Sequence, residues 1–429
     1  MKILIKNANT TSHSTNGIKN IVIENERISQ ISDTEIEGNF NLVIDAKFKK
    51  LIPGLIDMHV HLRDPGFEER ENLETGLKAA LNGGVTSVGV MPNTDPCIDN
   101  PYLVDYLNLK SEKLNLAKLF SISAVTKKRE GKELVEMEKI SNRGIVAFSD
   151  DGNPVEDPYL LLRALEITKK IKKPIINHCE VKELSKLGCI REGFYSNYYG
   201  ISGVPDVAES IMVARDIEMA RYTQSHIHIA HLSTKSSVDL IRNAKTKNIP
   251  VTSEVTHNHL LFTDKSISDF SSSKKVNPPL PTIDDQLALI EGIKDGTIDI
   301  IVSDHAPYTK EEKSVDFTKA PYGISGVETL LSSLILISKN HEIDFSRLID
   351  KVTYFPAKIF NLGLIGDIKE GYLADLVLLD LEKEWLVEEK SLVSKGKNTP
   401  FLGSTLPGKI EMVMVSGVIK IIGGRFTWN

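Results

Sequence analysis

Cysteine is scarce in this sequence, and the few cysteines are not spaced for a bridge or a metal. The 429 residues include only three, Cys97, Cys179 and Cys189, and no two of them form a CxxC pair. An odd number without such spacing argues against a disulfide framework and against a zinc site built from thiolates. We therefore expect a reducing compartment and place the protein in the cytoplasm.

Long apolar runs and a strong charge of one sign are also missing. The N-terminal stretch MKILIKNANTTSHS has a short apolar patch that Lys6 interrupts, so it lacks the apolar core and cleavage site of a signal peptide. No run reaches the roughly 18 apolar residues that a membrane-spanning helix needs. The formal net charge of -6 is spread along the chain. These features argue against a membrane protein and against nucleic acid as a partner.

From about residue 52 the sequence alternates short β-rich runs with helical patterns of ten or more residues. Alternating strands and helices predict a parallel sheet, and eight such units predict a closed (β/α)₈ barrel, which belongs to the α/β class. The predicted strands are Gly54–His61, Val85–Val90, Lys118–Ala124, Gly144–Phe148, Lys173–His178, His226–His231, Pro250–Val255 and Ile298–Ser303. The predicted helices are Glu68–Asn82, Glu133–Asn142, Pro158–Lys170, Asp206–Arg221, Ser236–Lys247 and Asp284–Lys294.

Both ends of the chain have the pattern of strands joined by turns. We expect strands around Lys2–Lys6, Asn20–Glu24 and Asn41–Asp45, and again at Gly371–Leu379 and Lys409–Ile422, where Gly417 breaks an apolar run. Chain termini often lie close together, so the two ends are expected to form one small β-sandwich domain. The predicted division is 1–51 for its first part, 52–365 for the barrel and 366–429 for its second part.

Histidines and aspartates gather where the predicted barrel strands end. His59 and His61 are two apart on a strand, so both side chains point the same way and can bind one metal ion. Strand four runs into Asp150 and Asp151, strands five and six end at His178 and His231, and strand eight ends at Asp304. The carboxyl ends of barrel strands face one site, so these ligands can converge. They are too many for one open tetrahedral site and suit two adjacent ions that share a carboxylate.

Other histidines fit that site less well. His226 and His228 are out of phase with His231, which favours hydrogen-bonded histidines packed under a helix. His257 and His259 follow strand seven, where a surface or gating role is as plausible as metal binding.

Five blocks in order resemble the dihydroorotases of the longer bacterial type, within the amidohydrolase superfamily. The blocks are His59-Val60-His61-Leu62-Arg63, Met91-Pro92-Asn93-Thr94, Phe148-Ser149-Asp150-Asp151-Gly152, Asn277-Pro278-Pro279-Leu280 and Ser303-Asp304-His305-Ala306-Pro307. The resemblance runs from Pro53-Gly54 to Asn398-Thr399-Pro400-Phe401. It implies the reversible conversion of N-carbamoyl-L-aspartate into L-dihydroorotate and water, a step of pyrimidine biosynthesis.

The resemblance also implies roles for the residues at the strand ends. One or two zinc ions are expected, most simply as a pair, with Asp151 rather than Asp150 as the bridge. The implied metal ligands are His59, His61, Asp151, His178, His231 and Asp304. Many relatives bridge their metals with a carboxylated lysine, which this segment lacks. Asp304 would also take a proton from the attacking water and hand it to the departing nitrogen.

Substrate contacts follow from the same blocks. The implied set is His61, Arg63, Asn93, Asn277, Tyr308, Tyr322 and Gly323. The planar fork of Arg63 matches a carboxylate, although a salt bridge to Asp64 or Glu68 is an alternative. Relatives usually have histidine where this chain has Tyr308, so we expect weaker carboxylate binding or a shift of that task onto Arg63.

Two other functions compete with this interpretation. Another cyclic amidohydrolase, such as an allantoinase or hydantoinase, shares the HxH motif but normally supplies the bridging lysine. A catalytically inactive homologue would serve as a structural partner of aspartate transcarbamoylase, yet all six ligand positions hold competent residues. A homodimer is expected from relatives, and an association with aspartate transcarbamoylase stays open.

Overall fold

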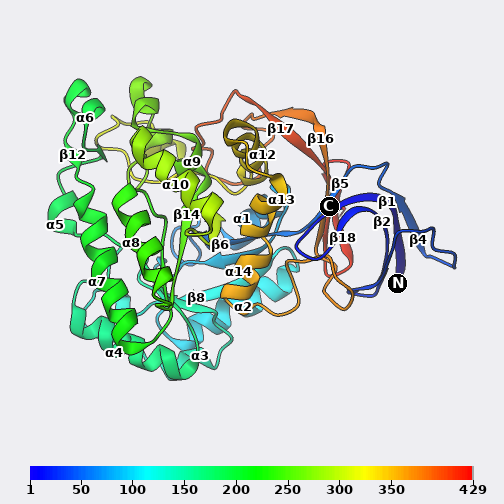
Figure 1. The fold of residues 1–429 in the computed structure, drawn as a ribbon, viewed down its shortest axis with the longest axis horizontal. Helices are drawn as coiled ribbons and strands as arrows, with labels where there is room; N and C mark the ends of the chain where they lie inside the picture. Colours follow the sequence, from blue (N-terminus) through cyan, green and yellow to red (C-terminus); the bar gives the residue numbers. More distant parts are fainter. Residues whose placement is uncertain (428–429) are drawn as a thin grey trace.

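The computed structural model describes residues 1–427, and its largest part is a barrel of eight parallel strands (Figure 1). The strand order along the sheet is β15-β14-β13-β10-β9-β8-β7-β6. A parallel bridge between Val60 and His305, with the amide of His61 donating to the carbonyl of His305 at 2.8 Å, joins the first strand to the last. The strands are β6 (Leu55–Val60), β7 (Val85–Val90), β8 (Lys118–Ser123), β9 (Ala147–Ser149), β10 (Ile175–Asn177), β13 (Ile227–Ile229), β14 (Val251–Thr256) and β15 (Ile300–Val302). The predicted barrel is confirmed, because each strand overlaps one of the eight predicted runs.

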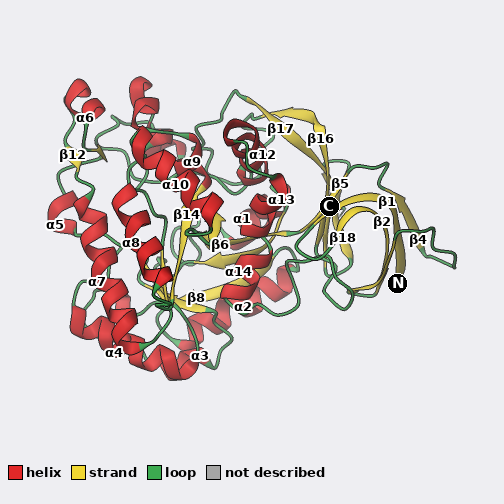
Figure 2. Ribbon diagram, viewed as in Figure 1, coloured by secondary structure: helices red, strands yellow, loops and turns green. Residues whose placement is uncertain are grey.

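Helices cover the outside of the barrel (Figure 2). All six residues of β6 are buried, as expected for a strand with helices on one side and the barrel interior on the other. The barrel helices are α1 (Leu73–Asn82), α2 (Pro101–Leu114), α3 (Met137–Ser141), α4 (Pro158–Ile171), α7 (Val207–Thr223), α8 (Lys235–Thr246), α10 (Ile283–Asp295), α12 (Leu330–His341), α13 (Phe345–Lys351) and α14 (Tyr354–Ile359). None of the described helices combines the length and apolar character that a membrane crossing requires.

Capping residues decide where several helices begin. Asn100 and Asp157 accept backbone amide bonds at the starts of α2 and α4, and a proline follows each cap. Helix α1 begins at Leu73, later than the predicted Glu68, because Asn72 forms a capping box with Thr75. Residues 64–71 therefore form an irregular loop before α1.

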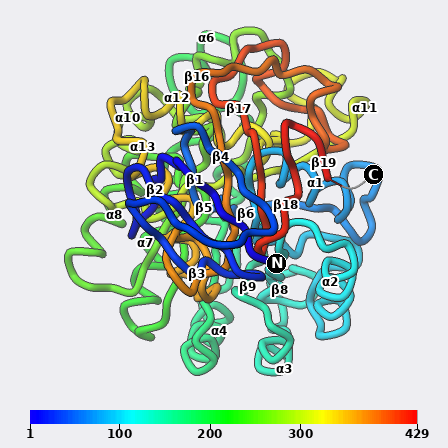
Figure 3. The backbone as a smooth tube through the Cα atoms, turned by 90° about the vertical axis from the view of Figure 1, so that its right-hand side faces the viewer, coloured from blue at the N-terminus to red at the C-terminus, as the bar shows by residue number. Residues whose placement is uncertain are grey.

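The two ends of the chain share one mixed sheet with the order β19-β18-β17-β16-β5-β1-β2-β3, and β4 pairs with β1. Figure 3 shows the first and last strands together on the face turned to the viewer. Apolar side chains from both ends, among them Ile5, Ile23 and Met414, form one buried cluster. The strands are β1 (Lys2–Thr11), β2 (Asn16–Glu24), β3 (Arg27–Ser32), β4 (Leu42–Asp45), β5 (Lys50–Pro53), β16 (Leu376–Leu386), β17 (Thr405–Val415), β18 (Val418–Ile422) and β19 (Arg425–Phe426). The exact division at residues 51 and 365 stays a proposal.

Short elements follow the barrel strands at their carboxyl ends. The excursion after β10 contains α5 (Lys182–Ser185), β11 (Ile190–Arg191), α6 (Phe194–Tyr199) and β12 (Gly203–Val204). The others are η1 (Lys127–Arg129), α9 (His257–Leu261), η2 (Asp264–Asp269), η3 (Ser272–Lys274) and α11 (Lys310–Lys313). This end of the barrel is also where the predicted metal ligands lie.

Candidate metal centre

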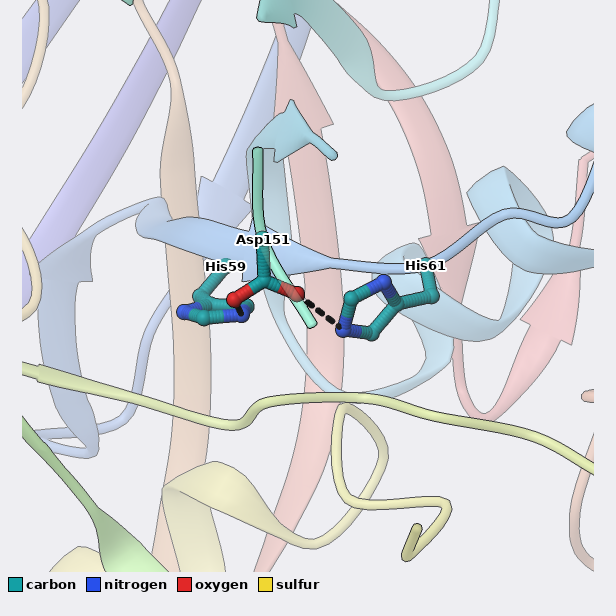
Figure 4. A group of neighbouring side chains, drawn as sticks. All are labelled: His59, His61 and Asp151. Atoms are coloured by element: carbon teal, nitrogen blue, oxygen red, sulfur yellow. Dashed lines mark ion pairs between the residues drawn. The ribbon is translucent and has the colours of Figure 1, made fainter. Parts of the chain in front are cut away.

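The first group of candidate ligands comes from β6 and from the turn after β9. Asp151 lies between His59 of β6 and His61, which directly follows that strand (Figure 4). Its Oδ1 is 3.3 Å from Nε2 of His59, and its Oδ2 is 3.6 Å from Nε2 of His61. The three side chains are buried.

The second group shares the same aspartate. Oδ1 of Asp151 is 3.9 Å from Nδ1 of His178 and 3.8 Å from Nε2 of His231, and those two ring nitrogens are 2.8 Å apart. Within each group the candidate ligand atoms lie within 4.8 Å of one another. One carboxylate therefore stands at the junction of two three-residue groups, an arrangement suited to two neighbouring ions.

Asp150 and Asp151 have different surroundings, which the sequence could not show. Oδ1 of Asp150 accepts hydrogen bonds from the amides of Val125 at 2.8 Å and Thr126 at 3.0 Å. Asp150 thus holds the loop after β8, while the neighbouring carboxylate turns toward the histidines.

Asp304 lies beside the first group. Its Oδ1 is 3.1 Å from Nε2 of His61 and 3.6 Å from Nε2 of His59. Burial raises the pKa of this carboxyl, but His59 and His61 outweigh it and bring the pKa below its usual value. The carboxylate is therefore ionised at neutral pH and able to accept a proton.

The donor set fits a divalent metal. Nε2 of His59 and Oδ1 of Asp151 are buried atoms without a hydrogen-bond partner among the described residues. A buried polar atom without a partner lowers the stability of the folded protein, and a cation bound to both atoms would remove this penalty. Imidazole nitrogens and carboxylate oxygens are also the ligands that zinc and similar ions take. Burial raises the pKa of Asp151, yet the adjoining histidines outweigh it and hold the pKa well below its usual value.

Three further side chains fix the orientation of the histidine rings. Nδ1 of His59 is 2.6 Å from Oε1 of Glu254, and Nδ1 of His61 is 2.8 Å from Oδ1 of Asn93. On the other side of the site, Nε2 of His178 is 3.0 Å from Oε2 of Glu180. Each contact occupies the ring nitrogen that faces away from Asp151, which sets the tautomer needed for metal binding.

Sequence reasoning missed Glu254 and Glu180 as supporting residues. Glu254 is fully buried within β14, where the expected companions are apolar. A carboxylate in the middle of a buried strand was the available signal, because a buried charge requires a partner.

A cavity of about 190 Å³ opens over the metal-binding groups. Its lining includes most of the residues that the sequence analysis assigned to metal or substrate. Those residues are His61, Arg63, Asp151, His178, His231, Asn277, Asp304, Tyr308, Tyr322 and Gly323. His59 and Asn93 are not part of this lining and contact it through Asp151 and His61.

Arg63 points a buried cation at this cavity. Only 6% of its surface is exposed, and its Nε donates to the carbonyl of Pro307 at 3.3 Å. The alternative salt bridge to Asp64 or Glu68 is not formed within residues 1–427, and Asp64 is instead 2.7 Å from Nζ of Lys110. An ionised ligand with a carboxylate would therefore find an unpaired guanidinium.

His228, His257 and His259 are buried. His257 and His259 lie in α9, so the surface role considered for them is wrong. Burial lowers the pKa of His257 to about 3 and that of His259 to about 4. Nε2 of His228 is 3.2 Å from Oε2 of Glu254, which confirms a hydrogen-bonded histidine, and its ring contacts Phe360, which follows α14.

Comparison with known proteins finds relatives over almost the whole chain. The Amidohydrolase family matches residues 51–420. A protein of Thermoanaerobacter sp. named dihydroorotase is 42% identical over 429 residues, which are 100% of this chain and 99% of that protein. The dihydroorotase of Staphylococcus epidermidis is 41% identical over 418 residues, 97% of this chain and 98% of that protein.

A solved structure, the L-hydantoinase of Arthrobacter aurescens, covers 99% of this chain and 97% of its own, with a TM-score of 0.88 and 23% identity. At that identity the likeness shows the fold alone.

Proposed function

From the premise that the chain belongs to the amidohydrolase family, with dihydroorotases among its relatives, we propose that it catalyses the dihydroorotase reaction. It is a metal-dependent cyclic amide hydrolase acting on a small molecule. The reaction interconverts N-carbamoyl-L-aspartate and L-dihydroorotate in pyrimidine biosynthesis. The observation that carries this choice is the cavity that unites the shared carboxylate Asp151 with the unpaired guanidinium of Arg63. That cavity pairs a hydrolytic centre with a site for the carboxylate that dihydroorotate carries beside its ring.

We propose zinc as the metal and two ions per subunit. His59, His61 and Asp304 would hold one ion, His178 and His231 the other, and Asp151 both. When bound, such ions lower the pKa of water from 15.7 to about 7 and polarise a carbonyl oxygen. The support for two ions is that two groups of candidate ligands share Asp151.

Asp304 is proposed to move the proton. In ring opening, water adds to the ring amide carbonyl at C4, and the carboxylate of Asp304 takes the proton that the water loses. The bond between that carbon and the ring nitrogen then breaks, and the same proton passes to the departing nitrogen. Ring closure is the reverse and starts with Asp304 protonated.

The substrate would be oriented by side chains around the cavity. Arg63 would bind the carboxylate, Asn277 and the hydroxyl of Tyr308 would add donors, and His61 and Asn93 would support the same region. Gly323 already uses its backbone groups within the protein, because its amide donates to Lys275 at 2.9 Å. A Cβ at Gly323 would lie 2.7 Å from the carbonyl oxygen of Ala306, so glycine allows this close approach. Tyr322 would then present its backbone to the ring.

Turnover with and without a chelator tests reaction and metal together. The purified protein is assayed with dihydroorotate, allantoin and a hydantoin, and its bound metal is measured. We expect dihydroorotate to be hydrolysed in preference, activity to vanish on chelation, and zinc to restore it. Preferred turnover of allantoin or the hydantoin would contradict the proposal and favour an allantoinase or hydantoinase.

An Asp304→Asn variant tests whether Asp304 transfers the proton. We expect it to lose about 10²- to 10⁴-fold in kcat, because an amide cannot carry the proton. Its zinc content is measured in parallel, since Asp304 is also a proposed ligand. An active Asp304→Asn variant would contradict the proton-transfer role, and a metal-free inactive wild type would favour the scaffold interpretation.

Further expectations from the sequence stay proposals. We propose that the protein acts in the cytoplasm and forms a homodimer. Mixing it with aspartate transcarbamoylase would test whether the two proteins associate.

A further inference from the structure

Tyr308 stands between two arginines at the edge of the cavity. The guanidinium carbon of Arg63 is 4.9 Å from the centre of its ring, and that of Arg70 is 5.0 Å away. Arg70 also lies 4.8 Å from the ring centre of Phe67, so its planar group sits between two aromatic side chains. Cations over aromatic faces attract the ring quadrupole, and arginine does so with a flat surface.

The two arginines differ in their charge partners. Arg70 contacts Glu312 of α11 through Nη2 at 2.6 Å and through Nε at 2.9 Å. Arg63 has no carboxylate partner within residues 1–427 and is more deeply buried. The ion pair therefore neutralises the outer arginine, and the inner one keeps its charge for the cavity.

Glu312 ties this arrangement to the loop that follows β15. Its Oε2 accepts the amide of Thr309 at 3.0 Å, which caps the short helix α11. The Arg70–Glu312 pair thus links the loop after β6, which carries Arg63, to the loop after β15, which carries Tyr308. The ring of Tyr308 lies within 5.0 Å of both guanidinium carbons, and Nζ of Lys313 in α11 is 5.7 Å from the ring centre.

Tyrosine suits this place better than a cationic ring would. A protonated imidazole at position 308 would stand between two guanidinium groups and be repelled by both, whereas a neutral phenol is attracted by both. The hydroxyl of Tyr308 has no hydrogen-bond partner among the described residues and is left for a ligand.

We propose that Arg70 is a positioning residue that acts through Tyr308 to hold the guanidinium of Arg63 toward the substrate carboxylate. This inference rests on the proposed function, because it requires a substrate with a carboxylate beside the reacting ring. Arg70 makes carboxylate binding stronger and leaves the bond-breaking step unchanged.

The test compares Arg70→Gln, Arg70→Lys and Glu312→Gln with the wild type in hydrolysis of dihydroorotate. We expect Arg70→Gln to raise KM about fivefold and to leave kcat within about twofold. Arg70→Lys keeps the charge but not the flat guanidinium, so its KM should lie between those of the wild type and Arg70→Gln. Glu312→Gln frees α11 and should raise KM about threefold. Inhibition by orotate, which carries the same carboxylate, should weaken in parallel with KM.

Arg163→Gln is the matched control, because Arg163 also pairs with a glutamate, Glu166, on the outer helix α4. It should leave KM and kcat unchanged, and the thermal midpoints of all variants are recorded. An unchanged KM in Arg70→Gln, or an equal fall of kcat in Arg70→Gln and Arg70→Lys, would overturn the positioning role alone. A wild type that neither hydrolyses dihydroorotate nor binds orotate would overturn the proposed function as well.

Discussion

Glu254 is a single buried carboxylate that holds two histidines. Its two oxygens contact Nδ1 of His59 at 2.6 Å and Nε2 of His228 at 3.2 Å. Burial raises the pKa of Glu254, but the two histidines outweigh this and hold the pKa well below its usual value. The side chain is therefore an anion that orients the proposed metal ligand His59 through its Nδ1, the ring nitrogen that faces away from Asp151.

Replacing this carboxylate tests that support. Glu254→Gln should weaken zinc binding about 10- to 100-fold, because a neutral amide lacks the negative charge that makes His59 a more basic ligand. Competition with a chromophoric chelator measures the change. The matched control is Glu291→Gln on the outside of α10, which should keep the wild-type affinity. Equal zinc affinity in the two variants would contradict the role of Glu254.

Tyr308 occupies the position where relatives usually have histidine, and its neighbours indicate how the substrate carboxylate is bound. The sequence predicted either weaker binding of the substrate carboxylate or binding of that carboxylate by Arg63 instead. The ring contacts with Arg63 and Arg70 favour the second outcome, because they place an unpaired guanidinium beside the cavity.

At the scale of elements, sharp turns after three strands aim side chains over the mouth of the barrel. Arg63, His231 and Asp304 have φ angles of 60°, 28° and 47°, values that L-residues rarely adopt. Each follows a barrel strand, β6, β13 or β15, within a few residues. Strain of about 1–3 kcal/mol at such a residue persists only where the surroundings enforce it, and it is concentrated at functional sites.

A segment from the C-terminal end of the chain also reaches the site. Asn398 accepts the amide of Tyr308 at 3.0 Å and donates to the carbonyl oxygens of Ala306 at 3.2 Å and Gly323 at 3.0 Å. This one side chain joins the loop after β15 to the loop around Gly323. The cavity therefore depends on residues beyond the barrel.

Removing that side chain should affect both stability and binding. Asn398→Ala removes the partner of the Tyr308 amide and of the Ala306 carbonyl, whereas the Gly323 carbonyl keeps Nζ of Lys313 at 2.9 Å. We therefore expect a loss of about 1–3 kcal/mol in unfolding free energy. The KM for dihydroorotate should rise as Tyr308 and Gly323 shift. Chemical unfolding and steady-state kinetics provide the measurements. The exposed Asn243→Ala on α8 is the control, and equal behaviour of the two variants would count against this link.

At the scale of the whole molecule, buried neutral histidines make the fold sensitive to acid. Burial lowers the pKa of His226 to about 4, with a smaller contribution from His228. Between about pH 6.5 and pH 4 the unfolded chain binds a proton at this residue and the folded protein does not. Stability is therefore complete above this window and is lost as the pH falls through it.

A variant without this group should lose less stability in acid. For His226→Gln, the fall in unfolding free energy between pH 7.5 and pH 5.0 should be smaller than in the wild type by about 1–2 kcal/mol. Urea unfolding at the two pH values measures the difference. The same pH dependence in both proteins would show that His226 titrates alike in the folded and unfolded states.

The sequence by itself determined the barrel, the pairing of both chain ends and the residues that gather at the strand ends. Periodicity and strand-end position are local properties, and a parallel barrel brings all carboxyl ends to one face. His59 and His61 were therefore predictable as a pair. The five family blocks further indicated Asp151, Arg63 and Asp304.

Only the tertiary structure decided what surrounds these side chains. It placed Asp150 against the loop after β8 and Glu254 behind His59. It also brought Arg63 and Arg70 to the ring of Tyr308. These contacts join residues that are remote in the chain. Which side chain faces which depends on turn geometry and packing that no local pattern encodes.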